Sequence, residues 1–435
     1  MSISTGHVGS SLAEDRDAPL IPPERLLPFL VVTALFFLWA IPNNLNDILI
    51  KQFMKSFAMN RSSAAQVQMA FYLGYFLLAI PAGQLMRRFG YKTGVVTGLV
   101  LLGGGCWMFW PAANAGSYQL FLAAEFVIAS GLSFLETAAN PFIAQLGPSG
   151  SSERRLNLSQ AFNPLGSIAA VLIGTLFIFS GVELTQAQTA AMQAAGTYHA
   201  YLHSETMRVV TPYIVLGAIA LAWAVMVILT KFPAVGLENV TRDSVKSLGE
   251  VSLWEWHFVS AVLAQFLYVG AQVGTWSYFI PYVETATGVG EKTAGFMLTA
   301  TLGAFAVGRF SSAWLMRFIP VRVLLGGYAV VNMVLGLVAV TRPTWVGAVC
   351  LLTTSLFMSM MFPTIFALGL KDMGTKTKTA GSLMVMAILG GALLTKLMGI
   401  LADARGLQMA YLIPVACFAG VALYAWLWAE RRVAY

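Results

Sequence analysis

The chain has 435 residues, of which 58% are hydrophobic and only 10% are charged. Soluble domains carry about a quarter charged residues, so this composition excludes an ordinary soluble domain and indicates a polytopic membrane protein. The net charge of +7 does not predict a nucleic-acid partner, because membrane topology decides where most basic residues lie.

Twelve segments are apolar for long enough to cross a membrane. A spanning helix needs about 20 mostly apolar residues. Runs of this kind predict helices, because only helices and closed barrels satisfy their backbone groups in lipid. The predicted spans are residues 26–50, 64–86, 93–113, 118–146, 156–180, 209–231, 254–282, 292–316, 321–341, 345–371, 380–402 and 408–430.

A polar stretch at 232–253 divides these helices into two sets of six that resemble each other. Leu85–Arg87 recurs as Leu315–Arg317, and "NPFIAQLG" resembles "FPTIFALG". Two six-helix repeats with a midplane site between them are typical of the major facilitator superfamily. We therefore expect a cytoplasmic tail (1–25), an N-terminal half (26–231), a cytoplasmic linker (232–253) and a C-terminal half (254–435).

The distribution of Lys and Arg predicts that both termini lie in the cytoplasm. Most of these residues fall in segments that this topology places inside. The first outer loop is the exception, since it carries Lys51, Lys55 and Arg61. The first 25 residues lack the basic start and short apolar core of a signal peptide, so we interpret them as a cytoplasmic tail.

Glu136 lies deep in the fourth predicted helix, with no Lys or Arg three or four positions away. An ionisable side chain inside a membrane helix faces the bundle interior or a water-filled cavity, and burial favours its protonated form. Glu136 is therefore a candidate proton-binding residue. The alternative is a neutral glutamic acid that joins neighbouring helices by hydrogen bonds.

Asp47 ends the stretch "NNLND" in the first predicted helix. Lys51 follows four residues later, which would suit an ordinary ion pair at the helix end. The amides of Asn43, Asn44 and Asn46 favour a helix that lines a polar cavity, because amides at a lipid-facing helix end would lack hydrogen-bond partners.

Two further helices carry polar faces. Asn157, Gln160 and Asn163 are three residues apart on the fifth helix, before Pro164, where we expect a bend. Their amides can bind sugar hydroxyls or join helices. The seventh helix carries a face of amides and aromatic rings that suits a pyranose ring, although such rings also serve packing. These residues are Gln265, Tyr268, Gln272 and Trp276.

Three other charged residues have structural interpretations. We expect Glu125 to be solvated near the outer end of its helix, and Arg309 to extend toward the cytoplasm. Lys396 is expected to pair with Asp403 or to extend outward. The sequence has no P-loop, HExxH or GxSxG motif and no CxxC pair. It therefore predicts neither an enzyme nor a bound cofactor or metal.

Several segments closely resemble the fucose–proton symporter family of the major facilitator superfamily. The likeness runs in order over nearly the whole chain from residue 26. It implies an all-α fold of twelve transmembrane helices that imports a monosaccharide with a proton by alternating access, as a monomer in the bacterial inner membrane. The segments are "FFLWAIPNNLNDILIKQF", "AFYLGYFLLAIPAGQLM", "FLETAANPFIAQLGP", "RLNLSQAFNPLGS", "AQFLYVGAQ" and "FPTIFALGL".

The resemblance assigns proton coupling to Asp47 and Glu136 and sugar binding to Gln160 and Asn163. Together with the polar faces above, it gives a set of candidate sugar-binding residues. These are Trp39, Asn43, Asn44, Gln160, Asn163, Gln272, Trp276 and Phe362.

Two departures from the family pattern leave the sugar open. Where fucose-transporting members have a Gln-Tyr pair before "PTIF", this chain has Met361 and Phe362, and Lys396 replaces a proline in helix eleven. Members of the family also carry glucose, galactose, mannose or N-acetylglucosamine. An uncoupled facilitator or exporter, and sodium in place of the proton, remain alternatives. A membrane sensor is disfavoured, because no signalling domain is appended.

Overall fold

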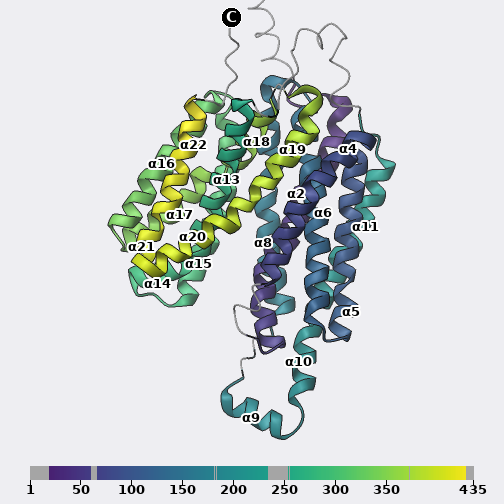
Figure 1. The fold of residues 1–435 in the computed structure, drawn as a ribbon, viewed down its shortest axis with the longest axis vertical. Coiled ribbons are helices and arrows are strands. Elements are labelled where there is room, and N and C mark those ends of the chain that lie inside the picture. The colour runs from purple at the N-terminus through teal and green to yellow at the C-terminus, as the bar shows by residue number, and fades with distance from the viewer. Residues whose placement is uncertain are drawn as a thin grey trace, which may run out of the picture. The chain divides into compact units, whose positions relative to one another are not determined.

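The computed structural model describes residues 19–59, 66–180, 182, 184–233, 253, 255–371 and 373–427. All regular elements within these ranges are helices (Figure 1). The α-helices before residue 232 are α2 (Leu26–Ser56), α4 (Gln66–Trp107), α5 (Phe109–Asn114), α6 (Tyr118–Gln145), α7 (Ser152–Gln160), α8 (Asn163–Ile173), α9 (Gln186–Ala194), α10 (Tyr198–Met207) and α11 (Val210–Leu229).

The remaining helices follow the linker. They are α13 (Trp256–Ser277), α14 (Phe279–Thr287), α15 (Glu291–Leu315), α16 (Val321–Thr341), α17 (Trp345–Met358), α18 (Met361–Leu370), α19 (Thr377–Met386), α20 (Gly390–Arg405), α21 (Leu407–Ala410) and α22 (Leu412–Leu427). Short 3-10 turns occur at Pro23–Arg25, Ser149–Ser151, Gly374–Lys376 and Ala387–Leu389, and a π-helical turn at Gly174–Ile178.

Each of the twelve predicted spans coincides with helix in the structure. Within the described residues, ten helical stretches are long and apolar enough to cross a membrane. One of them, Gln66–Asn114, contains two predicted spans, because α4 continues through a kink at Gly90. The φ angle of Gly90 is 84°, which only glycine adopts readily. The predicted span 292–316 is α15, which lies outside this set of ten.

The fifth predicted span is broken where the sequence places a proline. α7 ends at Gln160 and α8 begins at Asn163. In a continuous helix the carbonyl of Gln160 would accept a hydrogen bond from residue 164, but Pro164 has no N–H to donate. The predicted bend is therefore confirmed, and it leaves the Gln160 carbonyl available to another donor.

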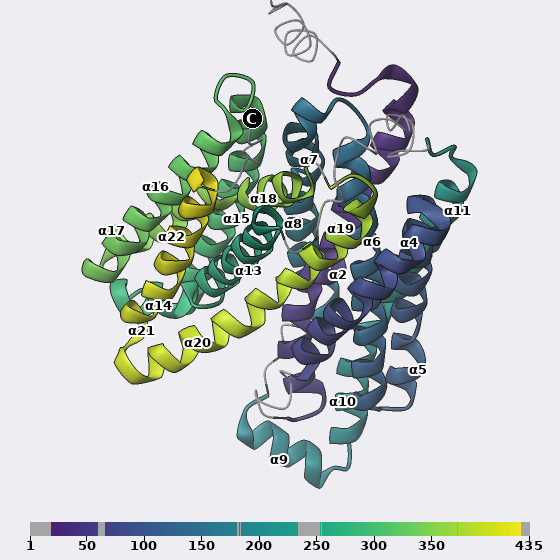
Figure 2. The same ribbon diagram turned by 45° about the horizontal axis from the view of Figure 1, so that its top comes forward.

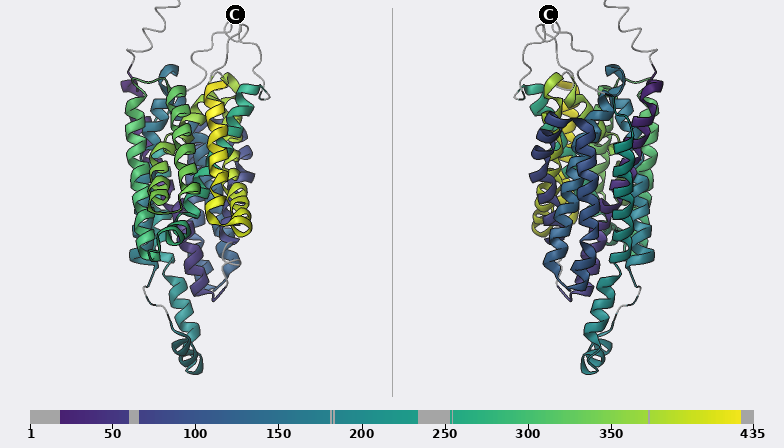
Figure 3. Two further views of the ribbon diagram at one scale, coloured as in Figure 1. Left: turned by 90° about the vertical axis from the view of Figure 1, so that its left-hand side faces the viewer. Right: turned by 90° about the vertical axis from the view of Figure 1, so that its right-hand side faces the viewer.

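The segment between the fifth and sixth predicted spans contains two helices that hydropathy does not predict. α9 begins with a capping box, in which the Thr185 hydroxyl accepts from the Gln188 backbone N–H and the Gln188 side chain accepts from the Thr185 N–H. This T-x-x-Q pattern was the available sequence signal. Figure 3 shows α10 and α9, in teal, extending beyond the ends of the other helices of their unit.

The chain divides into two compact units. The first contains residues up to Ala34, Ala139–Phe162 and the residues from Phe232 onward; the second contains Leu35–Ala138 and Asn163–Lys231. Each is described by itself below. The predicted division into two six-helix halves stays a prediction, and most of the predicted tail and linker lies outside the described residues.

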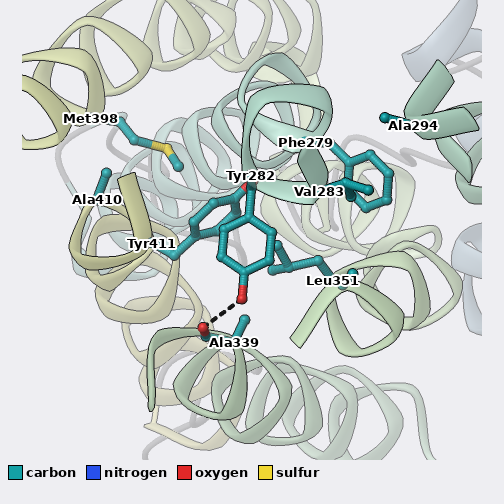
Figure 4. Close-up of a cluster of buried hydrophobic side chains, with 10 residues drawn as sticks. Phe279, Tyr282, Val283, Ala294, Ala339, Leu351, Met398, Ala410 and Tyr411 are labelled. Atoms are coloured by element: carbon teal, nitrogen blue, oxygen red, sulfur yellow. Dashed lines mark hydrogen bonds between the residues drawn. The ribbon is translucent and has the colours of Figure 1, made fainter. Parts of the chain in front are cut away.

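In the first unit, α16 packs against α17 and α22, and α13 packs against α20 and α22 (Figure 2). An aromatic and aliphatic cluster fills one end of this unit (Figure 4). Tyr282 and Tyr411 meet edge to face, with ring centroids 5.1 Å apart, and the Tyr282 hydroxyl donates to the Ala339 carbonyl at 2.6 Å. The buried phenol is therefore hydrogen-bonded, and the cluster forms a packed core.

Large apolar side chains are exposed on many helices of both units. Leu176, Leu229 and Phe296 are 67%, 78% and 67% exposed. Soluble monomers rarely expose apolar surface on this scale. These faces suit contact with lipid tails, which agrees with the apolar length of the helices.

Candidate substrate and proton site

The carboxyl group of Glu136 lies within electrostatic range of Tyr75. Glu136 is partly exposed on α6 and interacts electrostatically with the buried Tyr75 hydroxyl on α4. The Ser133 hydroxyl donates to the Tyr75 carbonyl at 2.9 Å. The helices approach closely at Gly74, where a Cβ would lie 2.7 Å from the Phe126 carbonyl oxygen. A glycine at this position therefore allows α4 and α6 to approach closely.

The "NNLND" stretch lies within α2, where it places amides in three environments. Asn43 is exposed, while the Asn44 amide donates to the carbonyl of Ala40 and to the Ser167 hydroxyl on α8, at 2.7 and 2.9 Å. Asn46 is 4% exposed, and its Oδ1 has no hydrogen-bond partner in the described part of the chain. The side chains of Asp47 and Lys51 lie outside the described residues, so the role of Asp47 stays a prediction.

Trp39 lies one turn before these amides and is 2% exposed. Its ring packs against that of Phe36, with centroids 4.3 Å apart. The Phe36 carbonyl accepts a hydrogen bond from the Asn163 amide at 3.3 Å. Trp39 and Asn163 are thus tied to the same turn of α2.

Gln160 is at the centre of a buried polar network in the first unit. Its Nε2 donates to Asn140 Oδ1 at 2.9 Å. Its Oε1 and its backbone carbonyl both accept from Nη1 of Arg309 on α15, at 2.8 and 3.0 Å. Gln160, Asn140 and Arg309 are 4%, 0% and 4% exposed.

The expectation that Arg309 extends toward the cytoplasm is wrong. The guanidinium is buried and hydrogen-bonded to Gln160, and its carbon lies 4.9 Å from the centre of the Phe305 ring. Burial is tolerated because the charge meets two oxygen acceptors and an aromatic face. No local sequence signal reports this, since the acceptors lie on α7, about 150 residues earlier along the chain.

A second contact joins α7 to another helix of the same unit. Asn157 Nδ2 donates to the hydroxyl of Thr364 on α18 at 3.0 Å. Both residues are buried. Asn157 therefore joins helices, which is the alternative that the sequence left open for this polar face.

The polar face of the seventh predicted helix, α13, is partly exposed in one part and fully buried in another. Gln272 is partly exposed, and Trp276 donates through Nε1 to the Ser355 hydroxyl at 3.0 Å while its ring meets Phe305 edge to face. Two turns earlier, Gln265 and Tyr268 are fully buried. Neither the Gln265 amide nor the Tyr268 hydroxyl has a hydrogen-bond partner among the described residues.

Burial without a partner marks Gln265 and Tyr268 as further candidate binding residues. An unsatisfied buried polar group costs roughly 1–3 kcal/mol, so proteins usually supply it with a partner, a water or a ligand. The sequence placed both residues on the polar face of this helix. Only the packing of the structure distinguishes them from Gln272.

Met361 and Phe362 form an apolar wall next to Tyr268. Met361 is 0% exposed and Phe362 9% exposed. The Phe362 ring meets Tyr268 edge to face, with centroids 6.4 Å apart, and stacks on Phe366 at 6.2 Å. Phe362 thus lies beside the buried ring of Tyr268, so a ligand bound at Tyr268 would also contact Phe362.

The expectation that Glu125 is solvated is also wrong. Glu125 is fully buried on α6, and its Oε1 lies 3.5 Å from the Tyr213 hydroxyl of α11. Tyr213 stacks on Phe109, with centroids 3.7 Å apart. This aromatic packing covers the carboxyl and excludes water from it. Lys396, in contrast, is exposed on α20, and its pairing or outward extension stays a prediction.

Comparison with known proteins places the chain in a family. A model of the Major Facilitator Superfamily matches residues 29–395. The chain belongs to the major facilitator superfamily. It is 44% identical over 410 residues to the L-fucose-proton symporter of Escherichia coli K12, covering 92% of both chains. It is 35% identical over 396 residues to a glucose/galactose transporter of Brucella abortus, covering 90% of this chain and 92% of that one.

The fold agrees with this membership. A crystal structure of the major facilitator superfamily transporter FucP in the outward conformation matches with a TM-score of 0.84 at 41% identity, covering 94% of this chain and 99% of that one. The predicted all-α fold of the superfamily is therefore confirmed. The protein is a multi-pass membrane transporter and not an enzyme.

Proposed function

We propose that this transporter imports a monosaccharide together with a proton by alternating access. The observation that carries the proposal is the 44% identity to a curated L-fucose-proton symporter, which extends over 92% of both chains. The compared region covers nearly the whole chain, including the helices that carry Glu136 and Gln160.

The residues of the site are chemically suited to bind both a proton and a sugar. Glu136 is a carboxyl group within a helix of a membrane transporter, which is a typical proton-binding position. The buried amides of Gln160 and Gln265 and the hydroxyl of Tyr268 suit a ligand rich in hydroxyl groups. Asp47 is the second proposed proton-binding residue. The proposed sugar-binding residues otherwise remain Trp39, Asn43, Asn44, Asn163, Gln272, Trp276 and Phe362.

L-Fucose is the first substrate to test, and related hexoses follow. A glucose/galactose transporter is 35% identical to this chain, and this relative makes glucose and galactose the next substrates to test. Met361 and Phe362 give an apolar wall, which tolerates a methyl group and discriminates weakly between similar sugars.

We further propose that the protein works as a monomer in the bacterial inner membrane with both termini in the cytoplasm. The excess of Lys and Arg in the predicted inner segments supports this orientation. Labelling of single cysteines introduced at the two termini, with a membrane-impermeant reagent, tests it. Reaction in intact cells would reverse the proposed topology.

Uptake in proteoliposomes tests the function. Purified protein is reconstituted with a pH-sensitive dye inside, and radiolabelled L-fucose, galactose, glucose, mannose and N-acetylglucosamine are added in turn. Symport predicts accumulation of a sugar, internal acidification when it enters, and loss of accumulation with a protonophore. Equilibration without acidification would instead identify a facilitator. Accumulation that requires a sodium gradient would identify sodium as the coupling ion.

A further inference from the structure

The carboxamide of Gln160, a proposed sugar ligand, is already occupied on both sides in this structure. Its Oε1 accepts from Arg309 Nη1 at 2.8 Å, and its Nε2 donates to Asn140 Oδ1 at 2.9 Å. With only 4% of its surface exposed, Gln160 has little room for a further partner. A sugar hydroxyl that binds to Oε1 must therefore compete with the guanidinium.

The break between α7 and α8 explains why Arg309 binds here. Pro164 cannot donate to the Gln160 carbonyl, so that oxygen is left for a donor from another helix. Arg309 Nη1 lies 3.0 Å from it while also donating to the side-chain oxygen of the same residue. One cation thus holds both the backbone and the side chain of Gln160, which fixes the direction of the carboxamide.

The network also contains an unused donor. Asn140 is fully buried, and its Nδ2 makes no hydrogen bond within the described ranges. This buried donor next to Gln160 could bind a hydroxyl group of a ligand that has displaced Arg309 from Gln160 Oε1.

We propose that Arg309 is a positioning residue that holds Gln160 in the sugar-free state and leaves Gln160 Oε1 when sugar binds. The inference rests on the proposed function. Gln160 belongs to the predicted N-terminal half and Arg309 to the predicted C-terminal half. Alternating access moves such halves against each other, so their contacts must break and re-form. Sugar binding then weakens one of these contacts, which links occupancy of the site to the conformational change.

Equilibrium binding to the purified full-length transporter tests this competition. Arg309→Met keeps the length of the side chain and removes its donors. We expect it to bind the transported sugar about three- to tenfold more tightly than the wild type, since one competing hydrogen bond is removed. In a Gln160→Ala background the same change should alter affinity less than about twofold, because the competition needs the carboxamide.

Two further variants separate competition from general loosening. Thr364→Val removes the bond to Asn157, which joins α7 to α18 without touching Gln160, and should leave sugar affinity unchanged. Arg309→Lys retains the charge with a single-point donor and should give an intermediate affinity. It carries the same comparison if Arg309→Met does not fold.

The outcomes are distinct. Unchanged affinity in both Arg309 variants, or an equal gain in the Gln160→Ala background, overturns the inference. Weaker binding would mean that Arg309 itself holds the sugar, which also overturns it. Failure of the wild-type protein to bind or accumulate any sugar of the panel would instead refute the proposed function.

Discussion

Lys55 and Glu205 form an ion pair that joins the C-terminal end of α2 to α10. The distance between Lys55 Nζ and Glu205 Oε2 is 3.1 Å. Glu205 is 3% exposed, and its backbone carbonyl also accepts from the Gln52 side chain at 2.8 Å. The pair neutralises Lys55, one of the three basic residues in the segment that the predicted topology makes the first outer loop.

Breaking this pair should destabilise the second unit. Glu205→Gln removes the negative charge, and we expect a loss of about 1.5–3 kcal/mol, the range for hydrogen bonds to charged groups. Thermal unfolding in detergent measures the effect, with Lys55→Met and the double variant completing a mutant cycle. Losses that simply add would mean that the two side chains do not stabilise each other.

An exposed acidic residue provides the control for this cycle. Asp403 is exposed on α20, and Asp403→Asn should change stability by less than about 0.5 kcal/mol. An equally large loss in this variant would show that removing any negative charge destabilises the protein.

Proton coupling should require a titratable group at position 136. Glu136→Gln keeps the shape and hydrogen-bonding capacity of the side chain but cannot release a proton. We expect it to retain sugar exchange across the membrane while losing accumulation against a gradient, and Asp47→Asn to do the same. Counterflow and proton-driven uptake in proteoliposomes measure these two activities separately. Wild-type accumulation in both variants would refute the assignment.

Glu125→Gln is the matched control for Glu136→Gln. Both residues are glutamates on α6, but Glu125 is enclosed by the packing of Tyr213 and Phe109. We expect accumulation to remain within about twofold of the wild type, because an amide fills the same enclosed space and this carboxyl is covered by aromatic packing. Loss of accumulation in Glu125→Gln would identify Glu125 as a further proton-binding residue beside Glu136 and Asp47.

The helices could be predicted because membrane length sets a requirement that the sequence shows directly. Runs of about 20 apolar residues must be helical in lipid, so all twelve predicted spans coincide with helix. Hydropathy says nothing of how helices continue at the membrane surface. The continuation of α4 through Gly90 and the helices α9 and α10 therefore became evident only from the structure.

Candidate site residues were predictable by type, while their partners were not. A polar residue in a membrane helix must find a partner, but that partner lies on another helix. The same local reasoning gave the wrong direction for Arg309 and for Glu125, since each is covered by residues more than 80 positions away. Gln265 and Tyr268 stand out only after packing shows which polar atoms remain unsatisfied.

Asn163→Ala tests the polar face of the fifth predicted span. The Asn163 amide makes a single long hydrogen bond, 3.3 Å, to the Phe36 carbonyl, so the side chain is available to a ligand. We expect sugar affinity to fall about three- to tenfold, which corresponds to one buried hydrogen bond. Calorimetric titration measures it, and Asn157→Ala is the control, because Asn157 is held by Thr364. Equal affinities in Asn163→Ala and the wild type would assign Asn163 to helix packing.

The apolar wall at position 362 should influence which sugar is preferred. Phe362 contacts the ring of Tyr268, and Phe362→Tyr adds one hydroxyl beside that buried phenol. A site that can hydrogen-bond a substrate hydroxyl discriminates more strongly than an apolar one. We therefore expect the preference for hexoses over L-fucose in competition uptake to rise about threefold to tenfold. The hexoses carry a hydroxyl on C6, where L-fucose has only a methyl group. Phe366→Tyr, one turn further along α18, is the control, and an identical sugar ranking in wild type and Phe362→Tyr would mean that residue 362 does not contact the sugar.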